Sequence, residues 1–305
     1  MLVERSGDKP LRPKQPIDGE KRAMSILRAI FQKESTSRAS IMPSGNLDRQ
    51  VVPLQRIQLF GCPIDNVTLQ EATERVEAFI QSGVPHRYFA MNVRKVAGFR
   101  QNATLQSIAN NCDLVTADGQ PIVWASRLFR KPLKERVTGI DLMESLIELS
   151  ARKGYGVFFL GARPEILERL LHTYQMEYPH LAVAGSRDGY WTVEEEQGVV
   201  QMVRAARADI VFLGMSSPAK ELFAEKYYQE INAPFLMGVG GAFDVVANLT
   251  SRAPAWLQRV GFEWIWRVAQ EPLRLSVRYL EDGFGFALAV IHEWRRNASH
   301  SDEAA

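Results

Sequence analysis

The feature of this sequence that most constrains its fold is an alternation of short apolar runs with longer amphipathic segments across residues 157–246. Each apolar run has the length of a buried strand, and the segments between the runs have helical spacing. This alternation predicts a parallel sheet with helices on both faces. The predicted strands are 157–160, 181–184, 210–213 and 234–237, and the predicted helices are 164–174, 193–206, 218–229 and one that begins at 241.

Residues 51–153 follow the same pattern with less regularity. Thr68 is predicted to cap the first helix, with Glu71 at the reciprocal position of a capping box. We therefore expect residues 51–250 to form one α/β domain. The predicted strands of this part are 57–60, 63–64, 88–91 and 113–116, and the predicted helices are 68–82, 93–110, 121–129 and 139–153.

The two ends of the chain differ from this domain in composition. Residues 1–50 carry ten Lys and Arg against six Asp and Glu, and we expect a disordered or weakly helical extension. Within it, residues 21–33 fit either a surface-binding helix or a tail helix without a role. Residues 251–305 are predicted to form an Arg- and Trp-rich helical appendage.

Composition and motifs exclude several classes of protein. The net charge is +2, with positive charge near both ends, which argues against nucleic-acid binding and favours an anionic surface. The two cysteines lack metal-site spacing, and neither HExxH nor Asp-x-Asp occurs, so no metal and no cofactor are expected. The sequence shows neither an apolar leader nor a run of 18 apolar residues, so neither secretion nor a membrane span is expected.

Polar residues and glycines follow the predicted strands, where open parallel sheets bind their ligands. Asn92 and Asp118 each come directly after a strand, and a carboxylate in this position is equally suited to cap the next helix. Gly238, Gly240 and Gly241 form a turn after the last strand, which we expect to expose backbone N–H groups to an anion.

The segment 252–278 holds five arginines and three of the six tryptophans. Arginine binds phosphate with two parallel charged hydrogen bonds, and tryptophan favours a boundary between water and apolar matter. The segment therefore favours an enzyme that holds a diphosphate beside a membrane. The alternative is a packed amphipathic helix with solvated charges.

Together these positions resemble the WecG/TagA/CpsF glycosyltransferases, glycosyltransferase family 26, over residues 57–279. The resemblance is carried by three blocks, of which the third is the most specific. They are Asn92 followed by a helix and then Asp118-Gly119; RVTGIDL at 136–142; and GVGGAFD at 238–244 with RAP at 252–254, GFEWIWR at 261–267 and EPLRLSVRY at 271–279.

The resemblance implies a single Rossmann-like domain with a C-terminal appendage that completes the site at the membrane. It implies an inverting, metal-independent enzyme that moves a sugar from a UDP-sugar donor to an undecaprenyl-diphosphate-linked sugar in bacterial surface or exopolysaccharide synthesis. Such an enzyme would be cytoplasmic and peripherally attached to the inner face of the cell membrane, and a homo-oligomer is left open.

The same resemblance assigns roles to individual residues. Asp118 matches the catalytic base and Asn92 a polar neighbour, and Arg136 matches a site arginine. Pro272 is predicted to break or kink the helix that carries the next arginines, so spacing alone does not align them. The arginines that match positions near the donor diphosphate are Arg267, Arg274 and, as an open case, Arg278.

The sequence departs from the family pattern at two positions. Ala90 stands where the family usually has Thr, and Lys220 stands where a Gln is usual and is thought to meet the donor sugar. A Gln amide donates and accepts hydrogen bonds, whereas Lys only donates and adds a charge. We expect a preference shifted from N-acetylmannosamine toward a hexose such as glucose or a uronic acid. The alternative is that Lys220 is a surface residue unrelated to the donor.

Three points stay open. The apolar residues after Tyr279 fit an interfacial helix or, equally, a helix docked on the core or on an oligomer partner. A Rossmann-type oxidoreductase is the alternative function, although the glycine turn lies late in the chain and is not GxGxxG. A non-catalytic lipid- or nucleotide-binding protein is the third class.

Overall fold

The computed structural model describes residues 55–302 except residues 100, 260 and 271. The chain divides into two units, Met1–Arg49 and Gln50–Ala305, and all that follows concerns the second. The predicted N-terminal extension, with its helix at 21–33, lies outside the described residues.

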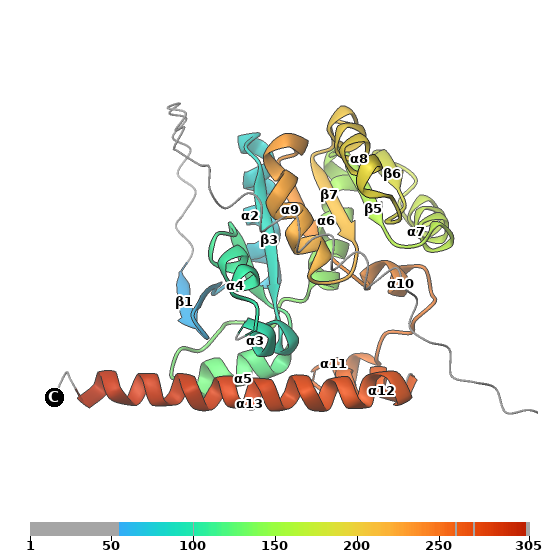
Figure 1. Cartoon of the computed structure of the whole chain (residues 1–305). Helices are drawn as coiled ribbons and strands as arrows, with labels where there is room; N and C mark the ends of the chain where they lie inside the picture. Colours follow the sequence, from blue (N-terminus) through green and yellow to red (C-terminus); the bar gives the residue numbers. More distant parts are fainter. Residues whose placement is uncertain (1–54, 100, 260, 271, 303–305) are drawn as a thin grey trace, which may run out of the picture. The chain divides into compact units, whose positions relative to one another are not determined.

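A six-stranded parallel sheet forms the centre of this unit (Figure 1). The strand order is β4-β3-β8-β7-β5-β6. Because the strands all run in one direction, their carboxyl ends lie along one edge of the sheet, where ligands bind in folds of this kind. The strands are β3 (His86–Met91), β4 (Leu114–Ala117), β5 (Val157–Gly161), β6 (Val183–Arg187), β7 (Ile210–Gly214) and β8 (Phe235–Gly238).

Helices cover both faces of the sheet, because successive side chains along a strand point to opposite faces. Phe159 and Phe212 pack with α2, α6 and α7, whereas Phe158 and Val211 pack with α8 and α9. Phe89 of β3 packs with α3, α4 and α5. The predicted α/β class is confirmed. The helices are α2 (Leu69–Ser82), α3 (Val93–Phe99), α4 (Ala103–Asn110), α5 (Gln120–Leu128), α6 (Gly139–Lys153), α7 (Pro164–Glu177), α8 (Val193–Ala205), α9 (Ala219–Ile231) and α10 (Ala242–Val246).

A β-hairpin, β1 (Arg56–Leu59) with β2 (Cys62–Asp65), stands beside the sheet. The buried Asp65 carboxylate accepts the Val115 N–H of β4 at 2.7 Å, which ties the hairpin to the sheet. The capping box predicted at Thr68 and Glu71 is present at the start of α2.

Most predicted boundaries are shifted by only a few residues, and two differences have an identifiable cause. The single helix expected at 93–110 is divided into α3 and α4, because the Asn102 side chain accepts the Leu105 N–H at 3.0 Å and caps a new helix. The strand expected at 181–184 runs over Val183–Arg187 and, among the described strands, forms one edge of the sheet beside β5. An edge strand that is partly exposed gives a weaker apolar signal than a central one.

After α10 the described chain forms three further helices: α11 (Ala255–Arg259), α12 (Glu263–Gln270) and α13 (Pro272–Asp302). The predicted break near Pro272 is confirmed, since the rings of Trp264 and Tyr279, fifteen residues apart in the chain, lie 5.9 Å apart, which one straight helix does not permit. The boundary between a domain of 51–250 and an appendage of 251–305 stays a prediction. No described helix carries an apolar stretch long enough to cross a membrane.

One side of α13 is docked on α3 and the hairpin. A Cβ atom placed on Gly285 would lie 2.7 Å from the Cβ of Ala97, so only glycine permits this approach. The Phe286 ring lies 5.4 Å from the Phe60 ring, centre to centre. Of the two alternatives for the tail, docking on the core therefore holds for this side of the helix.

The opposite side of α13 exposes apolar residues at helical spacing, with intervals of three, four or seven positions. They form an exposed stripe of Val277, Leu280, Phe284, Ile291 and Trp294. Phe284 is 69% exposed and Trp294 is 64% exposed. Side chains of this size are usually covered, so the stripe marks a surface for contact.

Candidate active site

Asn92 and Asp118 lie side by side at the carboxyl ends of two neighbouring strands. The Asp118 N–H donates to the Met91 carbonyl at 2.7 Å, which extends the β3–β4 pairing by one step. A Cβ placed on Gly119 would lie 4.0 Å from the Asn92 Cβ. Asn92 caps α3, since its Oδ1 accepts the Lys95 N–H at 3.1 Å. Main-chain geometry therefore fixes the place of both predicted residues.

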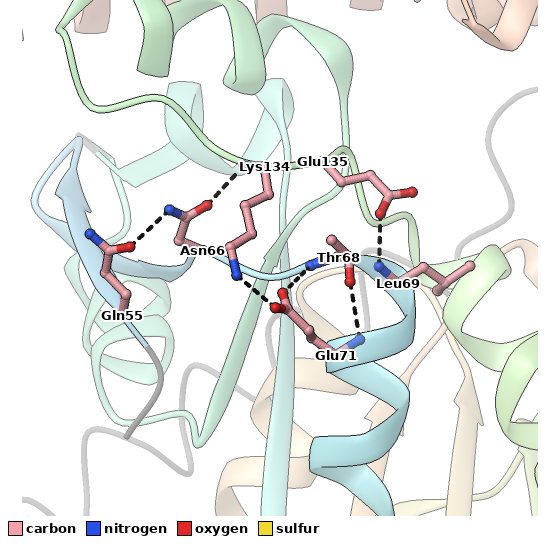
Figure 2. A network of polar contacts seen from close by, with 7 residues as sticks. All are labelled: Gln55, Asn66, Thr68, Leu69, Glu71, Lys134 and Glu135. Atoms are coloured by element: carbon pink, nitrogen blue, oxygen red, sulfur yellow. Dashed lines mark hydrogen bonds and ion pairs between the residues drawn. The ribbon is translucent and has the colours of Figure 1, made fainter. Parts of the chain in front are cut away.

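The loop that carries Arg136 is held on the first turn of α2 (Figure 2). The Lys134 N–H donates to Asn66 Oδ1 at 2.8 Å, and the Lys134 ammonium lies 2.6 Å from the Glu71 carboxylate. The Leu69 N–H donates to the Glu135 carboxylate at 2.9 Å. These contacts anchor both residues before Arg136, although the pair at Lys134 is partly exposed and adds little stability by itself.

The next residues of this loop attach to the sheet below the strand ends. The Thr116 hydroxyl of β4 donates to the Val137 carbonyl at 3.0 Å and lies 2.7 Å from the Tyr88 hydroxyl of β3. Burial, and to a lesser degree the Asp118 carboxylate, raises the pKa of Tyr88, which keeps this phenol protonated. The loop, Tyr88 and Asp118 thus belong to one region of the sheet.

The appendage reaches this region through residue 261. A Cβ on Gly261 would lie 2.3 Å from Cγ of Gln120, the residue that follows Asp118 and Gly119. The φ of +82° at Gly261 also favours glycine. The Trp124 and Phe262 rings meet edge to face at 6.3 Å. The connection between α11 and α12 therefore lies against the first turns of α5.

Two ion pairs also join the appendage to this part of the domain. Arg136 Nη1 lies 3.2 Å from Glu263 Oε2, and both side chains are about 15% exposed. Arg252 pairs with Asp141, whose other oxygen accepts the Thr138 hydroxyl. Arg136, expected to meet substrate, is therefore engaged by a carboxylate of the appendage. Because arginine binds carboxylate and phosphate oxygens in a similar way, Glu263 occupies the guanidinium that an anionic substrate would use.

The glycine turn after β8 corrects one expectation. We expected Gly238, Gly240 and Gly241 to expose N–H groups to an anion, but the Val239 and Gly240 N–H groups both donate to the Leu213 carbonyl, at 3.0 and 3.2 Å. The expectation of an open nest is wrong for these two groups, because β7 uses them. What the glycines provide is room, since a Cβ on Gly238 would lie 2.9 Å from Cδ of Lys220.

Lys220 lies beneath that turn and is buried, so the alternative of a surface residue is wrong. Its ammonium is 3.1 Å from Glu221 Oε1, and the Lys95 ammonium is 2.9 Å from the same oxygen. Burial alone would raise the pKa of Glu221, but the two ammonium groups lower it to about 2. Burial lowers the pKa of Lys220, while Glu221 and, more weakly, Asp118 oppose this shift.

The remaining predicted arginines lie on the appendage helices. Arg267 is in α12, and Arg274 and Arg278 are in α13, but their side chains lie outside the described ones. The main chain thus places them on two consecutive helices on either side of the break before Pro272. Within the described residues, no group of three or more His, Cys, Asp and Glu side chains is arranged to hold a metal ion.

Sequence reasoning missed Lys95, Glu221 and Glu263. Lys95 lies three residues after Asn92 on α3, and Glu221 lies beside Lys220 on α9. A charged residue on the otherwise apolar side of a helix was the signal available for Lys95, which lies next to the buried Val96. The pairing of Lys95 with Glu221 depends on α3 and α9 meeting in space, which no local sequence pattern encodes.

Comparison with known proteins gives a family match and several relatives. The chain matches the model of the glycosyl transferase WecG/TagA/CpsF family over residues 57–300. It is 31% identical over 188 residues to an N-acetylglucosaminyldiphosphoundecaprenol N-acetyl-beta-D-mannosaminyltransferase of Bacillus spizizenii, covering 61% of this chain and 72% of that protein. It is 28% identical over 223 residues to the protein of the same name from Staphylococcus aureus strain MW2, covering 72% of this chain and 87% of that protein.

These comparisons give the oxidoreductase alternative no support. The family match covers the strand-end residues, the Arg136 loop and all three appendage helices, and both relatives are named as transferases of a sugar. The chain therefore belongs to the WecG/TagA/CpsF family and is a glycosyltransferase.

Proposed function

We propose that this enzyme transfers a sugar, with inversion and without a metal, from a UDP-sugar to a sugar linked to undecaprenyl diphosphate. The observation that carries the proposal is the placement of Asp118 at a strand end between Asn92 and the first turn of α5, with the appendage packed on that turn. The relatives from Bacillus spizizenii and Staphylococcus aureus are named for an acceptor of this kind, an N-acetylglucosaminyl diphosphoundecaprenol.

Asp118 is the general base of the proposed reaction. The acceptor hydroxyl loses its proton to the Asp118 carboxylate as its oxygen bonds to the anomeric carbon of the donor. The bond from that carbon to the diphosphate breaks on the opposite side, and UDP leaves with the electron pair. A positioned base is typically worth about 10²–10⁴ in rate. Asn92, beside it, is suited to hold the acceptor because an amide both donates and accepts hydrogen bonds.

The leaving UDP gains negative charge, which must be stabilised. Arg267, Arg274 and Arg278 on α12 and α13 are assigned to the diphosphate, and Arg136 to the substrate beside Asp118. Guanidinium groups aimed at a developing charge in a site with little water are an effective stabiliser. The glycine turn offers the diphosphate fewer backbone donors than its sequence implies, because two of its N–H groups already donate to the Leu213 carbonyl.

The donor sugar is proposed to be a hexose such as glucose or a uronic acid rather than N-acetylmannosamine. The support is Lys220, buried at the strand ends, whose ammonium cannot accept a hydrogen bond. A polymer assembled on such a lipid carrier would be a bacterial surface polysaccharide or exopolysaccharide. A screen of UDP-sugars against a lipid-diphosphate acceptor identifies the donor directly.

The enzyme is proposed to work on the inner face of the bacterial cell membrane, held there by α13. The exposed stripe of α13 is apolar along its length and lies opposite the side docked on α3. Residues 252–278 add five arginines against two glutamates, which favours an anionic lipid surface. A lipid-linked acceptor requires the site to be near the bilayer. The partner of this stripe is therefore proposed to be a lipid surface.

The central test replaces Asp118 by Asn. We expect kcat to fall by about 10²–10⁴ while the affinity for UDP is retained, since only proton transfer is lost. Asp113→Asn is the matched control, because this carboxylate lies at the other end of β4 and accepts the Arg87 N–H, which an amide oxygen also accepts. A full rate in Asp118→Asn, or an equal loss in Asp113→Asn, would refute the assignment. In the same assay EDTA should leave the wild-type rate unchanged.

A further inference from the structure

Helix α5 exposes apolar side chains that have no part in the proposed proton transfer or in binding the diphosphate. Trp124 is 44% exposed and Leu128 is 60% exposed. They are four residues apart, so they lie on one face of the helix, while Ile122 and Ala125 are buried on the other. Among the described residues, Trp124 is the one exposed tryptophan outside the appendage. Exposed side chains of this size mark a surface that binds an apolar partner.

The appendage extends this face at one end. The Phe262 ring, which is 40% exposed, meets the Trp124 ring edge to face at 6.3 Å. Leu128, Trp124 and Phe262 thus form one exposed row, the α5 patch, to which the sheet domain and the appendage both contribute. Arg127, beside Leu128 in the chain, is exposed as well and gives the patch a charged neighbour.

The α5 patch begins close to the proposed base. Helix α5 starts at Gln120, two residues after Asp118, and a Cβ on Gly261, the neighbour of Phe262, would lie against Gln120. At about 1.5 Å per residue, Trp124 is about 6 Å and Leu128 about 12 Å along the helix axis from Gln120. The patch therefore leads away from the reacting groups over about two helical turns.

The far end of α5 lies near α13. Phe129, the residue after α5, meets the ring of Phe60 in the hairpin turn edge to face at 6.2 Å. The Phe60 ring in turn lies 5.4 Å from the Phe286 ring of α13. Helix α5 thus runs from the proposed base toward the helix whose opposite flank carries the exposed stripe.

We infer that the α5 patch binds the first isoprene units of the acceptor's undecaprenyl chain. This inference rests on the proposed function and adds the carrier lipid to it. With the acceptor sugar at Asp118, the chain that is joined to it through the diphosphate must leave the site beside this base. The α5 patch is apolar, begins there and leads toward α13, the helix proposed to lie on the bilayer. A chain on this path removes Trp124 and Leu128 from water, which favours acceptors with a long chain.

The test compares two acceptors that carry the same N-acetylglucosaminyl diphosphate, one on undecaprenol and one on a short alkyl chain. Both are assayed with the UDP-sugar that the donor screen identifies, at one detergent concentration and without vesicles, so that bilayer binding by α13 does not contribute. Leu128→Asn and Trp124→Ala should each raise KM for the undecaprenyl acceptor by about tenfold, because an apolar contact is lost. For both acceptors kcat should stay within about twofold of wild type, as should KM for the short-chain acceptor.

Two further variants serve as controls. Met176→Asn removes an apolar side chain that is 72% exposed on α7, which leads into β6 at the opposite end of the strand order from β4. It should leave both KM values unchanged. Leu128→Met keeps an apolar side chain and should retain the low KM for the undecaprenyl acceptor. Leu128→Asn leaves the ring pair of Trp124 and Phe262 in place, so its effect does not arise from the packing of the appendage.

Three results would overturn the inference while leaving the proposed function intact. The first is a wild-type KM for the undecaprenyl acceptor in Leu128→Asn and Trp124→Ala enzymes that thermal melting shows to be folded. The second is an equal rise in KM for both acceptors, which would indicate an effect on the sugar site or on the fold. The third is a loss of vesicle binding with unchanged KM in detergent, which would assign the patch to the bilayer. If the wild-type enzyme transfers sugar to neither acceptor, the proposed function itself is overturned.

Discussion

The two sides of the candidate site are held by different kinds of contact. On the sheet side, Asp118 and Asn92 are fixed by main-chain hydrogen bonds that continue the strands or begin a helix. On the appendage side, the described contacts with α5 and α6 include a glycine, an aromatic pair and two ion pairs. The place of the proposed base is thus set by the fold, whereas the appendage is held by side-chain contacts with which an anionic substrate would compete.

This difference predicts where catalysis can be lost without loss of the fold. Arg267→Ala combined with Arg274→Ala should lower kcat by about 10²–10³, because charge on the leaving UDP is no longer stabilised. The melting temperature should change little, since both residues lie on the appendage helices and not in the sheet. Arg295→Ala, which removes an exposed arginine further along α13, is the control. Wild-type kinetics in the double variant would remove both arginines from the site.

A second experiment examines the contact that joins the two sides. Arg136→Ala should weaken binding of the UDP donor by about tenfold or more, because a charged hydrogen bond is lost. Glu263→Gln should leave binding equal or tighter, since it frees Arg136 from a competing carboxylate. The double variant gives the coupling between the two residues. If Glu263→Gln weakens binding as much as Arg136→Ala, the ion pair itself forms the site and the substrate does not compete for Arg136.

The smallest effect is expected at the exposed stripe of α13. Phe284→Glu should reduce the partition of the enzyme onto anionic vesicles by about tenfold, because the bilayer no longer buries an aromatic ring. Activity on a short-chain, water-soluble acceptor should stay near wild type, since the sheet side is untouched. Glu281→Gln, an exposed neighbour, controls for the change of charge. Unchanged vesicle binding in Phe284→Glu would mean that another surface meets the lipid.

The sequence predicted the fold well where one local signal was sufficient. The strand and helix periods predicted the parallel sheet. Thr68 and Glu71 predicted the start of α2, and Pro272 predicted a helix break before α13. The division between α3 and α4 was not predicted. An asparagine is compatible with a helix interior, and only the structure shows that Asn102 caps a new helix.

The candidate site was predicted less completely, for a physical reason. Asp118 and Asn92 follow strands and could be assigned to one edge of the sheet by rule. The partners of Lys220 could not, since they come from helices that meet only after folding. The Val239 and Gly240 N–H groups donate to a carbonyl of the neighbouring strand β7. The glycine pattern alone therefore predicted more free N–H donors than the structure has at this turn.

The placement of α13, with one flank docked and the opposite flank exposed, has a geometric consequence. One flank rests on α3, the helix that Asn92 caps, and the other flank is the apolar stripe. With that stripe on lipid, a single helix diameter, about 10 Å, separates α3 from the bilayer. The reacting hydroxyl is then kept at head-group depth, where a sugar joined to its lipid through two phosphates already resides. The carrier would present its sugar without being lifted out of the leaflet.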